Sequence, residues 1–257
     1  MNREQIAITL YTLRDHCTTA TAFAATLRRL YAIGYRAVQL SGVGPIPEHQ
    51  LASILNDEGM TCCATHENGA ALLTQTARII DRLAALGCTY TAYPFPAGVD
   101  TGSQESVDTL IAGLNRAGEA LHAHGQVLTY HNHGIEFRRI EGETILERIY
   151  RSTNPLYLQG ELDTYWVQAG GESPQGWCRR LTNRLPLLHL KDYGIDSEGR
   201  GVFSEVGSGN LNWKEIIDAA DTSGCRWFII EQDSNWANND PFESARISYH
   251  WVAQTLC

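Results

Sequence analysis

The stretch LIAGLNRAGEALHAHGQVLTYH, residues 110–131, contains the unit from which the fold of this chain can be predicted. Apolar residues in 110–124 recur with the period of an amphipathic helix, and Gly125 follows directly. A glycine just past a helix end takes the left-handed conformation that closes the last turn. The next residues, 126–131, form a short apolar run of the kind found in strands buried on both faces. The stretch therefore predicts a helix followed at once by a buried parallel strand.

The same order of helix, glycine and strand recurs along the chain. Four further glycines stand between a helical segment and a short apolar run: Gly34, Gly59, Gly87 and Gly224. Two more units have a proline-containing turn instead, at Pro155 and Pro186, and an opening strand IAITLY covers 6–11. Helices between the strands imply parallel crossovers. Eight units in a chain of this length predict a single (β/α)8 TIM-barrel domain over residues 1–257.

An open doubly wound sheet is the alternative α/β architecture. Its nucleotide-binding version has a GxGxxG turn after the first strand, but TLYTLRD stands there at residues 9–15. No Pro/Ser-rich linker or block of charge divides the chain. Both observations favour the barrel.

Composition and charge restrict the expected partners. Of 257 residues 43% are hydrophobic, and 20 Lys and Arg against 29 Asp and Glu give a net charge of −9. Because phosphate binding requires a basic field, this acidity argues against nucleic acid or an anionic membrane as a partner. No apolar run reaches the roughly 18 residues of a membrane span, and the N-terminus lacks a secretory pattern. A small-molecule partner is expected, and a homo-oligomer is left open.

The cysteines indicate the redox environment. There are seven, an odd number, and no CxxC pair occurs among them. Small buried thiols are typical of a protein in a reducing compartment, because disulfides persist in oxidising ones. The expected location is cytoplasmic.

Catalytic groups of (β/α)8 barrels lie at the C-terminal ends of the strands, so these positions define the candidate site. Asp163, His189 and Glu231 each follow apolar strand residues there. Carboxylates that converge with an imidazole at the barrel mouth would repel one another unless a proton or a cation neutralises them. One divalent metal ion is the simplest solution, and an oxygen-rich donor set suits Mn²⁺, our first choice, as well as Mg²⁺, Co²⁺ or Zn²⁺.

Several motifs together resemble one protein family. They are YTLRD at 11–15, YHNHGIEF at 130–137, LD at 162–163, HLKD at 189–192, VGSGNLNW at 206–213 and IIEQD at 229–233. In this order they resemble the xylose-isomerase-like TIM barrel superfamily of sugar phosphate isomerases and epimerases. Its members include D-tagatose 3-epimerase, inosose dehydratase and endonuclease IV. The resemblance implies a metal site made of one carboxylate from the fifth strand together with Asp163, His189 and Glu231.

The fifth strand departs from the pattern of the epimerases. They place the metal-binding Glu three residues before the Asn of the motif, where this chain has Thr129. The remaining carboxylate near this strand is Glu136, which we assign as the fourth metal ligand. His131 or His133 could take that place instead.

The resemblance and the strand ends together indicate a metal-dependent sugar or polyol isomerase or epimerase. The metal would chelate a carbonyl oxygen and the neighbouring hydroxyl, acidify the α-proton and stabilise the enediolate. Glu136 and Glu231 would remove and return that proton from opposite faces. Lys191 and one of His131 and His133 would balance charge on the oxygens.

Further residues near the mouth are expected to contact or cover the substrate. His66 ends the third strand, and Trp166 and Trp236 follow the sixth and eighth strands. Aromatic rings of this kind pack against sugar faces. The long glycine-rich segment 192–213 is a candidate lid.

Three other functions compete with this interpretation. In a lyase, the same proton abstraction is followed by loss of a β-oxygen from a keto-sugar, keto-glycoside or keto-inositol, with His131 or His133 as the acid. A phosphodiesterase like endonuclease IV is opposed by the net charge and by too few histidines for a multi-zinc site. A catalytically inactive barrel used for binding is distinguished by metal analysis.

Overall fold

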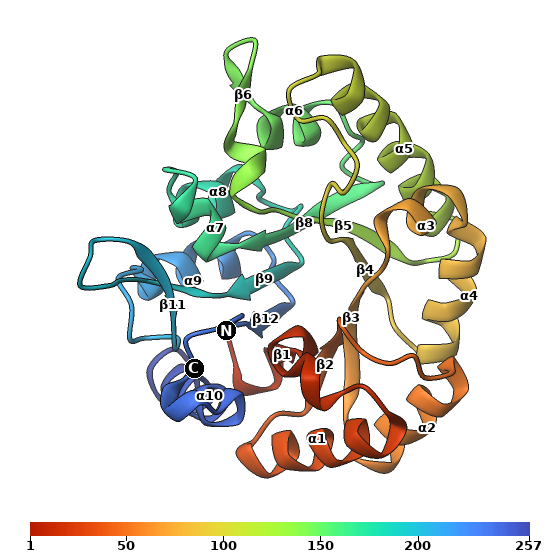
Figure 1. Cartoon of the computed structure of the whole chain (residues 1–257). Helices are drawn as coiled ribbons and strands as arrows, with labels where there is room; N and C mark the ends of the chain where they lie inside the picture. Colours follow the sequence, from red (N-terminus) through yellow and green to blue (C-terminus); the bar gives the residue numbers. More distant parts are fainter.

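The computed structural model describes residues 1–257 and contains a closed barrel of parallel strands (Figure 1). Every neighbouring pair in the barrel is parallel. Around the barrel the strands are β1 (Ile6–Thr9), β2 (Ala37–Leu40), β3 (Thr61–His66), β4 (Tyr90–Tyr93), β5 (Val127–His131), β8 (Leu158–Asp163), β9 (Leu187–Leu190) and β12 (Trp227–Ile230), which pairs with β1. The predicted single (β/α)8 barrel is confirmed.

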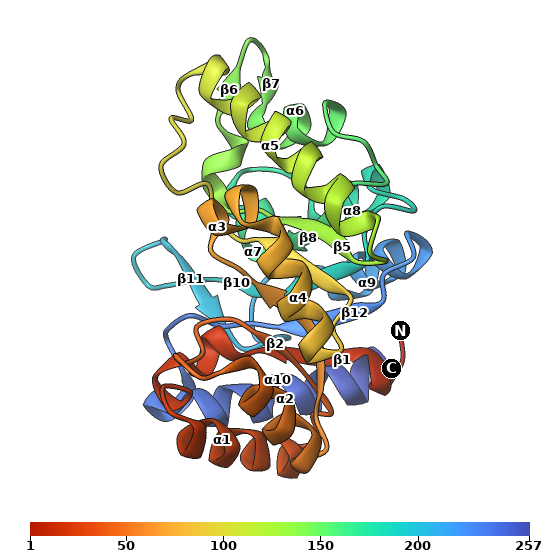
Figure 2. The same cartoon turned by 90° about the vertical axis from the view of Figure 1, so that its right-hand side faces the viewer.

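Helices form the outer layer around the strands (Figures 1 and 2). The α-helices are α1 (Ala20–Ile33), α2 (Glu48–Asp57), α3 (Gly69–Thr74), α4 (Thr76–Leu86), α5 (Gln104–His122), α6 (Ile145–Arg151), α7 (Thr164–Ala169), α8 (Pro174–Arg180), α9 (Trp213–Thr222) and α10 (Pro241–Thr255). Short 3₁₀-helices are η1 (Arg3–Gln5), η2 (Leu10–His16), η3 (Gly134–Phe137) and η4 (Ala237–Asn239). The large hydrophobic core includes side chains from both the strands and the helices.

The glycines that follow helices have the backbone conformation that the sequence indicated. Gly87 closes α4 with φ +61°, and Gly125 follows α5 with φ +72°. A Cβ at either position would meet no neighbouring atom, so the positive φ alone accounts for the glycine. These turns allow the chain to enter the next strand directly.

The interior of the barrel has an apolar base and a polar upper layer. The base is a cluster of mostly small side chains: Ala7, Ala37, Cys63, Ala64, Leu187 and Ile229. Residues two positions apart on a strand face the same way, so His189 stands above Leu187 and Glu231 above Ile229. The polar layer therefore lies at the C-terminal end of the barrel, supported by a packed base.

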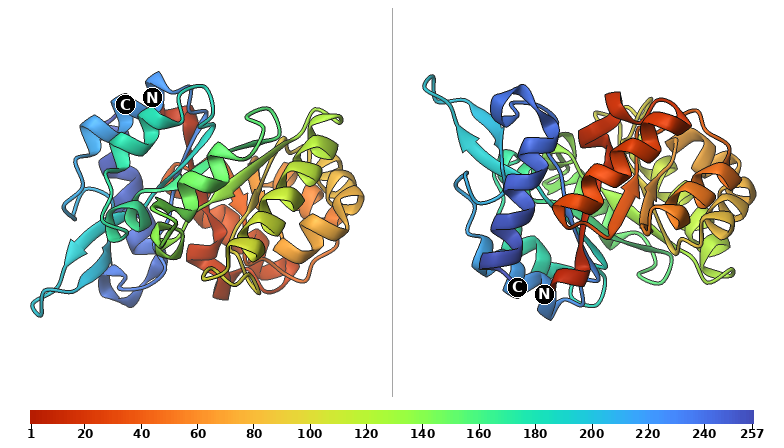
Figure 3. Two further views of the ribbon diagram at one scale, coloured as in Figure 1. Left: turned by 90° about the horizontal axis from the view of Figure 1, so that it is seen from above. Right: turned by 90° about the horizontal axis from the view of Figure 1, so that it is seen from below.

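Two antiparallel hairpins stand outside the barrel: β6 (Arg139–Ile140) with β7 (Glu143–Thr144), and β10 (Asp192–Ile195) with β11 (Gly201–Ser204). The β10–β11 hairpin projects as an arm (Figures 2 and 3). The sequence analysis treated this part of 192–213 as a loop. The structure differs because β10 and β11 pair as an antiparallel ladder. The register runs from Asp192 opposite Ser204 to Ile195 opposite Gly201.

Two further features bear on the sequence-based expectations. No helix combines the length and the apolar character needed to cross a bilayer. All seven cysteines are free; six are buried, and Cys257 is exposed. The buried thiols pack as small apolar side chains.

Candidate active site

Side chains from four neighbouring strands converge at the C-terminal end of the barrel. His131 ends β5, Asp163 ends β8, His189 lies on β9, and Glu231 directly follows β12. These side chains belong to residues at most 4% exposed, and one ligand atom of each lies within 4.8 Å of the others. They converge because β5, β8, β9 and β12 are consecutive neighbours in the barrel.

This group contains a buried acceptor without a donor. Asp163 Oδ1 accepts a hydrogen bond from the Trp166 amide at 3.1 Å and so caps α7. Asp163 Oδ2 has no hydrogen-bond partner, and His131 Nε2 lies 3.9 Å from it. Nearby, His189 Nδ1 is 2.7 Å from Glu231 Oε2. Two imidazoles and two carboxylates around an unpaired buried oxygen form a donor set that fits a divalent cation.

Burial and neighbouring charges shift the pKa values of this group in different directions. Burial raises the pKa of Asp163 to about 7. Burial acts in the same sense on Glu231, but Lys191 and His189 outweigh it and hold the pKa of Glu231 well below its usual range. For His189, burial would lower the pKa, yet Glu161 and Glu231 raise it to about 10. Without a metal, His189 is therefore cationic and Asp163 is partly protonated near neutral pH.

Lys191 places a buried positive charge beside these carboxylates. The residue is 1% exposed. Its Nζ donates a hydrogen bond to Asp233 and lies 3.4 Å from Glu231 Oε2 and 3.6 Å from Asp163 Oδ2. Burial would lower the pKa of Lys191, but the three carboxylates outweigh burial and raise it. The structure thus brings Lys191 to the place beside the expected metal ligands that the sequence indicated.

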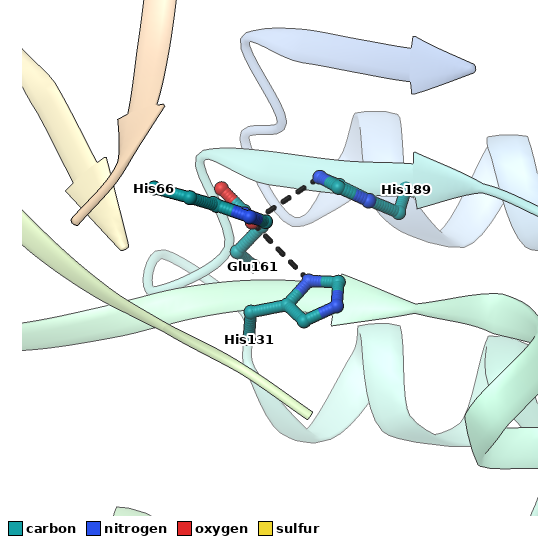
Figure 4. Close-up of side chains that lie close together, drawn as sticks. All are labelled: His66, His131, Glu161 and His189. Atoms are coloured by element: carbon teal, nitrogen blue, oxygen red, sulfur yellow. Dashed lines mark hydrogen bonds and ion pairs between the residues drawn. The ribbon is translucent and has the colours of Figure 1, made fainter. Parts of the chain in front are cut away.

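Glu161 also belongs to this cluster, although the sequence analysis did not select it. It lies on β8 two residues before Asp163 and is fully buried. Its Oε1 contacts His66 Nε2 and lies 3.2 Å from both His131 Nδ1 and His189 Nε2 (Figure 4). The signal that could have found it is the sequence ELD, in which residues two apart share the inward face.

Glu136 lies apart from this cluster. It belongs to η3, is fully buried, and accepts hydrogen bonds from Tyr130 Oη at 3.0 Å and from the His133 amide at 2.8 Å. Burial raises the pKa of Glu136 to about 7. The chain leaves strand geometry after His131 and turns into η3, which directs Glu136 back toward β5. The structure therefore brings His131, and not Glu136, beside Asp163.

A polar cavity of about 430 Å³ opens above the cluster. Its polar walls include His66, His131, His133, Lys191, Glu231 and Asp233. Phe95 and Tyr11 add aromatic surface. A cavity of this size with acids, bases and a cation around it suits a small polyhydroxylated molecule.

The two tryptophans expected to bind substrate have different positions. The Trp166 ring lies 5.4 Å from the His133 ring and 5.4 Å from Lys191 Nζ, next to the cavity wall. Trp236 donates its Nε1 hydrogen to the Gln232 carbonyl at 3.4 Å and does not line the cavity. Neither tryptophan lines the cavity, but Trp166 packs behind His133 and Lys191, which do.

Hydrogen bonds and aromatic packing hold the base of the β10–β11 hairpin beside the mouth of the cavity. The Asp192 carboxylate accepts hydrogen bonds from the Gly207 amide at 2.8 Å and from Trp213 Nε1 at 2.8 Å. Phe203 of β11 packs on Tyr165 with ring centroids 4.3 Å apart, and its ring lies 4.8 Å from Lys191 Nζ. The base of the arm therefore adjoins the cationic side of the cavity.

Comparison with known proteins identifies the family. The sequence pattern of the family described as "Xylose isomerase-like TIM barrel" matches residues 27–254. The chain belongs to this family. The resemblance that the motifs indicated is therefore confirmed.

Curated relatives of the family match part of the chain. Inosose dehydratase from Geobacillus thermodenitrificans (strain NG80-2) is 28% identical over 169 residues, which cover 60% of this chain and 56% of that protein. Inosose dehydratase from Lacticaseibacillus casei is 27% identical over 164 residues, 58% of this chain and 54% of that protein. The match thus spans about half the length of these relatives.

Solved structures share the fold over nearly the whole chain. A sugar phosphate isomerase/epimerase from Parabacteroides distasonis ATCC 8503 superposes with a TM-score of 0.82 at 22% identity, covering 97% of this chain and 93% of the other. An L-ribulose 3-epimerase gives 0.74 at 16% identity, covering 99% and 94%. At these identities the likeness concerns the fold.

Proposed function

We propose that this protein is a divalent-metal-dependent isomerase or epimerase of a sugar or polyol, acting by removal of a proton α to a carbonyl. The observation that carries the proposal is the buried group of His131, Asp163, His189 and Glu231 beneath a polar cavity. Asp163 Oδ2 has no hydrogen-bond partner in this group and is available to a cation. Family membership supports this choice, since sugar isomerases and epimerases are among the proteins that share the fold.

These four residues would hold the metal, with His131 in the position first assigned to Glu136. Two nitrogen and two oxygen donors suit Mn²⁺, Co²⁺ or Zn²⁺, and Mn²⁺ remains our first choice. When bound, the ion supplies Lewis acidity that polarises a substrate carbonyl and its neighbouring hydroxyl.

The side chains around the cavity divide the proton transfer and the charge balance between them. Glu231 lines the cavity and its Oε2 lies 3.4 Å from Lys191 Nζ, so it is the proposed proton acceptor on one face. His133 lines the same cavity, and its Nδ1 has no hydrogen-bond partner, so it is the proposed group on the other face. Lys191, held by Asp233, places its ammonium where it stabilises negative charge on a substrate oxygen.

Glu136 remains the alternative to His133 for the second proton transfer. Its carboxylate accepts a hydrogen bond from the His133 amide, so a change at Glu136 would also displace His133. The variant His133→Gln separates the two assignments, because it removes the proton-accepting ring but leaves the Glu136 carboxylate in place.

A lyase that eliminates a β-oxygen after the same proton abstraction is the second candidate. The observation that favours it is the sequence match to inosose dehydratases. Burial lowers the pKa of His133 to about 2, so its ring is neutral in the free protein. In the lyase it would have to gain a proton in the complex with substrate before it could donate one to the leaving oxygen.

Proton exchange in D₂O tests the proposal. Metal-free protein is loaded with Mn²⁺ for turnover assays, or with Mg²⁺ for NMR, and incubated with keto- and aldo-sugars and inososes. We expect exchange of the α-proton together with an epimer or isomer; an unsaturated product instead identifies the lyase. Glu231→Gln should lower the rate by about 10²-fold or more, whereas the exposed Glu198→Gln should keep it. Absence of exchange across the panel with a metal-loaded protein would contradict the proposal.

A further inference from the structure

Three imidazole rings meet at one carboxylate oxygen inside the barrel. Glu161 Oε1 contacts His66 Nε2 and lies 3.2 Å from His131 Nδ1 and 3.2 Å from His189 Nε2 (Figure 4). We infer that Glu161 is a positioning residue, which holds the rings of His131 and His189 so that their opposite nitrogens face the metal. This inference rests on the metal site of the proposed function.

The two nitrogens of each ring have different neighbours. On His131, Nδ1 faces Glu161, while Nε2 lies 3.9 Å from Asp163 Oδ2. On His189, Nε2 faces Glu161, while Nδ1 lies 2.7 Å from Glu231 Oε2. In both rings, therefore, the nitrogen away from Glu161 is the one directed at the proposed metal ligands. Neither 3.2 Å contact has the geometry of a hydrogen bond, so both are close polar contacts. A proton on the nitrogen next to Glu161 leaves the other nitrogen with a free lone pair for the metal.

Glu161 is itself held in place. Its Oε2 accepts a hydrogen bond from Gln39 Nε2 at 2.8 Å, and the residue is fully buried on β8. Glu161 and Asp163 face the same interior because they are two residues apart. One strand thus supplies a metal ligand and, one layer below it, the carboxylate that orients two further ligands.

The same atoms offer a second interpretation, in which His66, His131, Glu161 and His189 bind a cation of their own. That cation would take His131 Nδ1 and His189 Nε2, the nitrogens that now face Glu161. It would leave the buried Asp163 Oδ2 without a hydrogen-bond partner. The positioning role explains why the rings of His131 and His189 contact Glu161. It also leaves Asp163 Oδ2 available to the metal.

Metal affinity provides the first test. The dissociation constant for Co²⁺ is measured by competition with a chelator in the wild type, in Glu161→Gln and in the control Glu205→Gln, which removes a partly buried carboxylate outside the cluster. We expect one equivalent to bind in all three, with 10- to 100-fold weaker affinity in Glu161→Gln, as is usual for loss of such a partner. The visible spectrum of bound Co²⁺ should also shift in Glu161→Gln only.

A second variant tests whether Glu161→Gln acts only through a folding defect. Gln39→Leu keeps Glu161 but removes the hydrogen bond to its Oε2. It should weaken Co²⁺ binding in the same direction by a smaller factor. Unchanged affinity and spectrum in both Glu161→Gln and Gln39→Leu would overturn the inference. So would two equivalents of Co²⁺ in the wild type that fall to one in Glu161→Gln, because that result identifies a second cation site.

Histidine nitrogen NMR of the metal-free protein separates this inference from the proposed function. With ¹⁵N-labelled histidine, we expect the proton of neutral His131 on Nδ1 in the wild type and a mixture of both tautomers in Glu161→Gln. If the wild type binds no metal, the proposed function fails, yet this readout still reports the orienting role. An identical His131 tautomer in both proteins would refute the role of Glu161.

Discussion

At the scale of single residues, the two carboxylate oxygens of Asp163 have different surroundings. One oxygen caps α7 through the Trp166 amide, and the other is buried without a donor. Burial raises its pKa to about 7 from its ordinary value of 3.8, so the folded metal-free protein binds this proton more tightly than the unfolded chain. The stability from this group is therefore complete below pH 3.8 and declines as the pH rises toward 7.

Asp163→Asn should consequently stabilise the metal-free protein while it abolishes metal binding. At pH 8 we expect its melting temperature to exceed that of the metal-free wild type by about 2 °C or more, and the difference to vanish near pH 4. Scanning calorimetry and elemental analysis measure the two effects. The exposed Asp218→Asn should alter neither. Full metal occupancy in Asp163→Asn would remove this residue from the ligand set.

Lys191 contributes a buried positive charge at the mouth of the cavity. Its Nζ is within 3.6 Å of three carboxylates. Lys191→Met should lower kcat by about 10²-fold or more, the usual scale for loss of one stabilising group at a developing oxyanion, with a smaller change in KM. Steady-state kinetics on the substrate found by proton exchange checks this. A kcat equal to that of the control Lys214→Met would show that Lys191 acts only structurally.

At the scale of elements, the units that combine a helix, a glycine and a strand were predictable, whereas the β10–β11 arm was not. Local signals mark the barrel strands, since each apolar run after the opening strand follows a helix-ending glycine or a proline turn. The arm has no comparable signal: Gly194, Gly199 and Gly201 favour a flexible loop, and only the ladder between its strands makes it regular. Phe203 then joins the arm to the site by packing on Tyr165.

If the arm responds to ligand, its turn at 196–200 should be protected when the cavity is filled. Limited proteolysis of metal-loaded protein should cleave this exposed turn more slowly with saturating substrate or inhibitor, because ordering of Phe203 near Lys191 restrains β11. Phe203→Ala should lose this protection. The turn between β6 and β7 serves as an internal control and should be cut at the same rate throughout. Equal cleavage at 196–200 with and without ligand would exclude a lid.

At the scale of the whole molecule, the site depends on which strands are neighbours in the barrel. This dependence determines which of its residues could be predicted from the sequence. Asp163, His189 and Glu231 could be placed together because each stands at a strand end in the predicted barrel. The fourth member could not, since the choice between His131 and Glu136 depends on where β5 ends and η3 begins. Glu161 was not selected from the sequence, because its proposed role depends on the histidine rings that surround it in the fold.

The packing of the whole molecule also determines which thiols can react. Six cysteines are buried, and burial raises the pKa of Cys17 and of Cys178 to about 12, so almost no thiolate forms there at pH 8. Cys257 alone is exposed. A thiol reagent should therefore modify one cysteine quickly in the native protein and seven after denaturation without reductant. Fast labelling should disappear in Cys257→Ser. Two or more fast thiols in that variant would show that the barrel opens more readily than this packing allows, and fewer than seven in denaturant would reveal a disulfide.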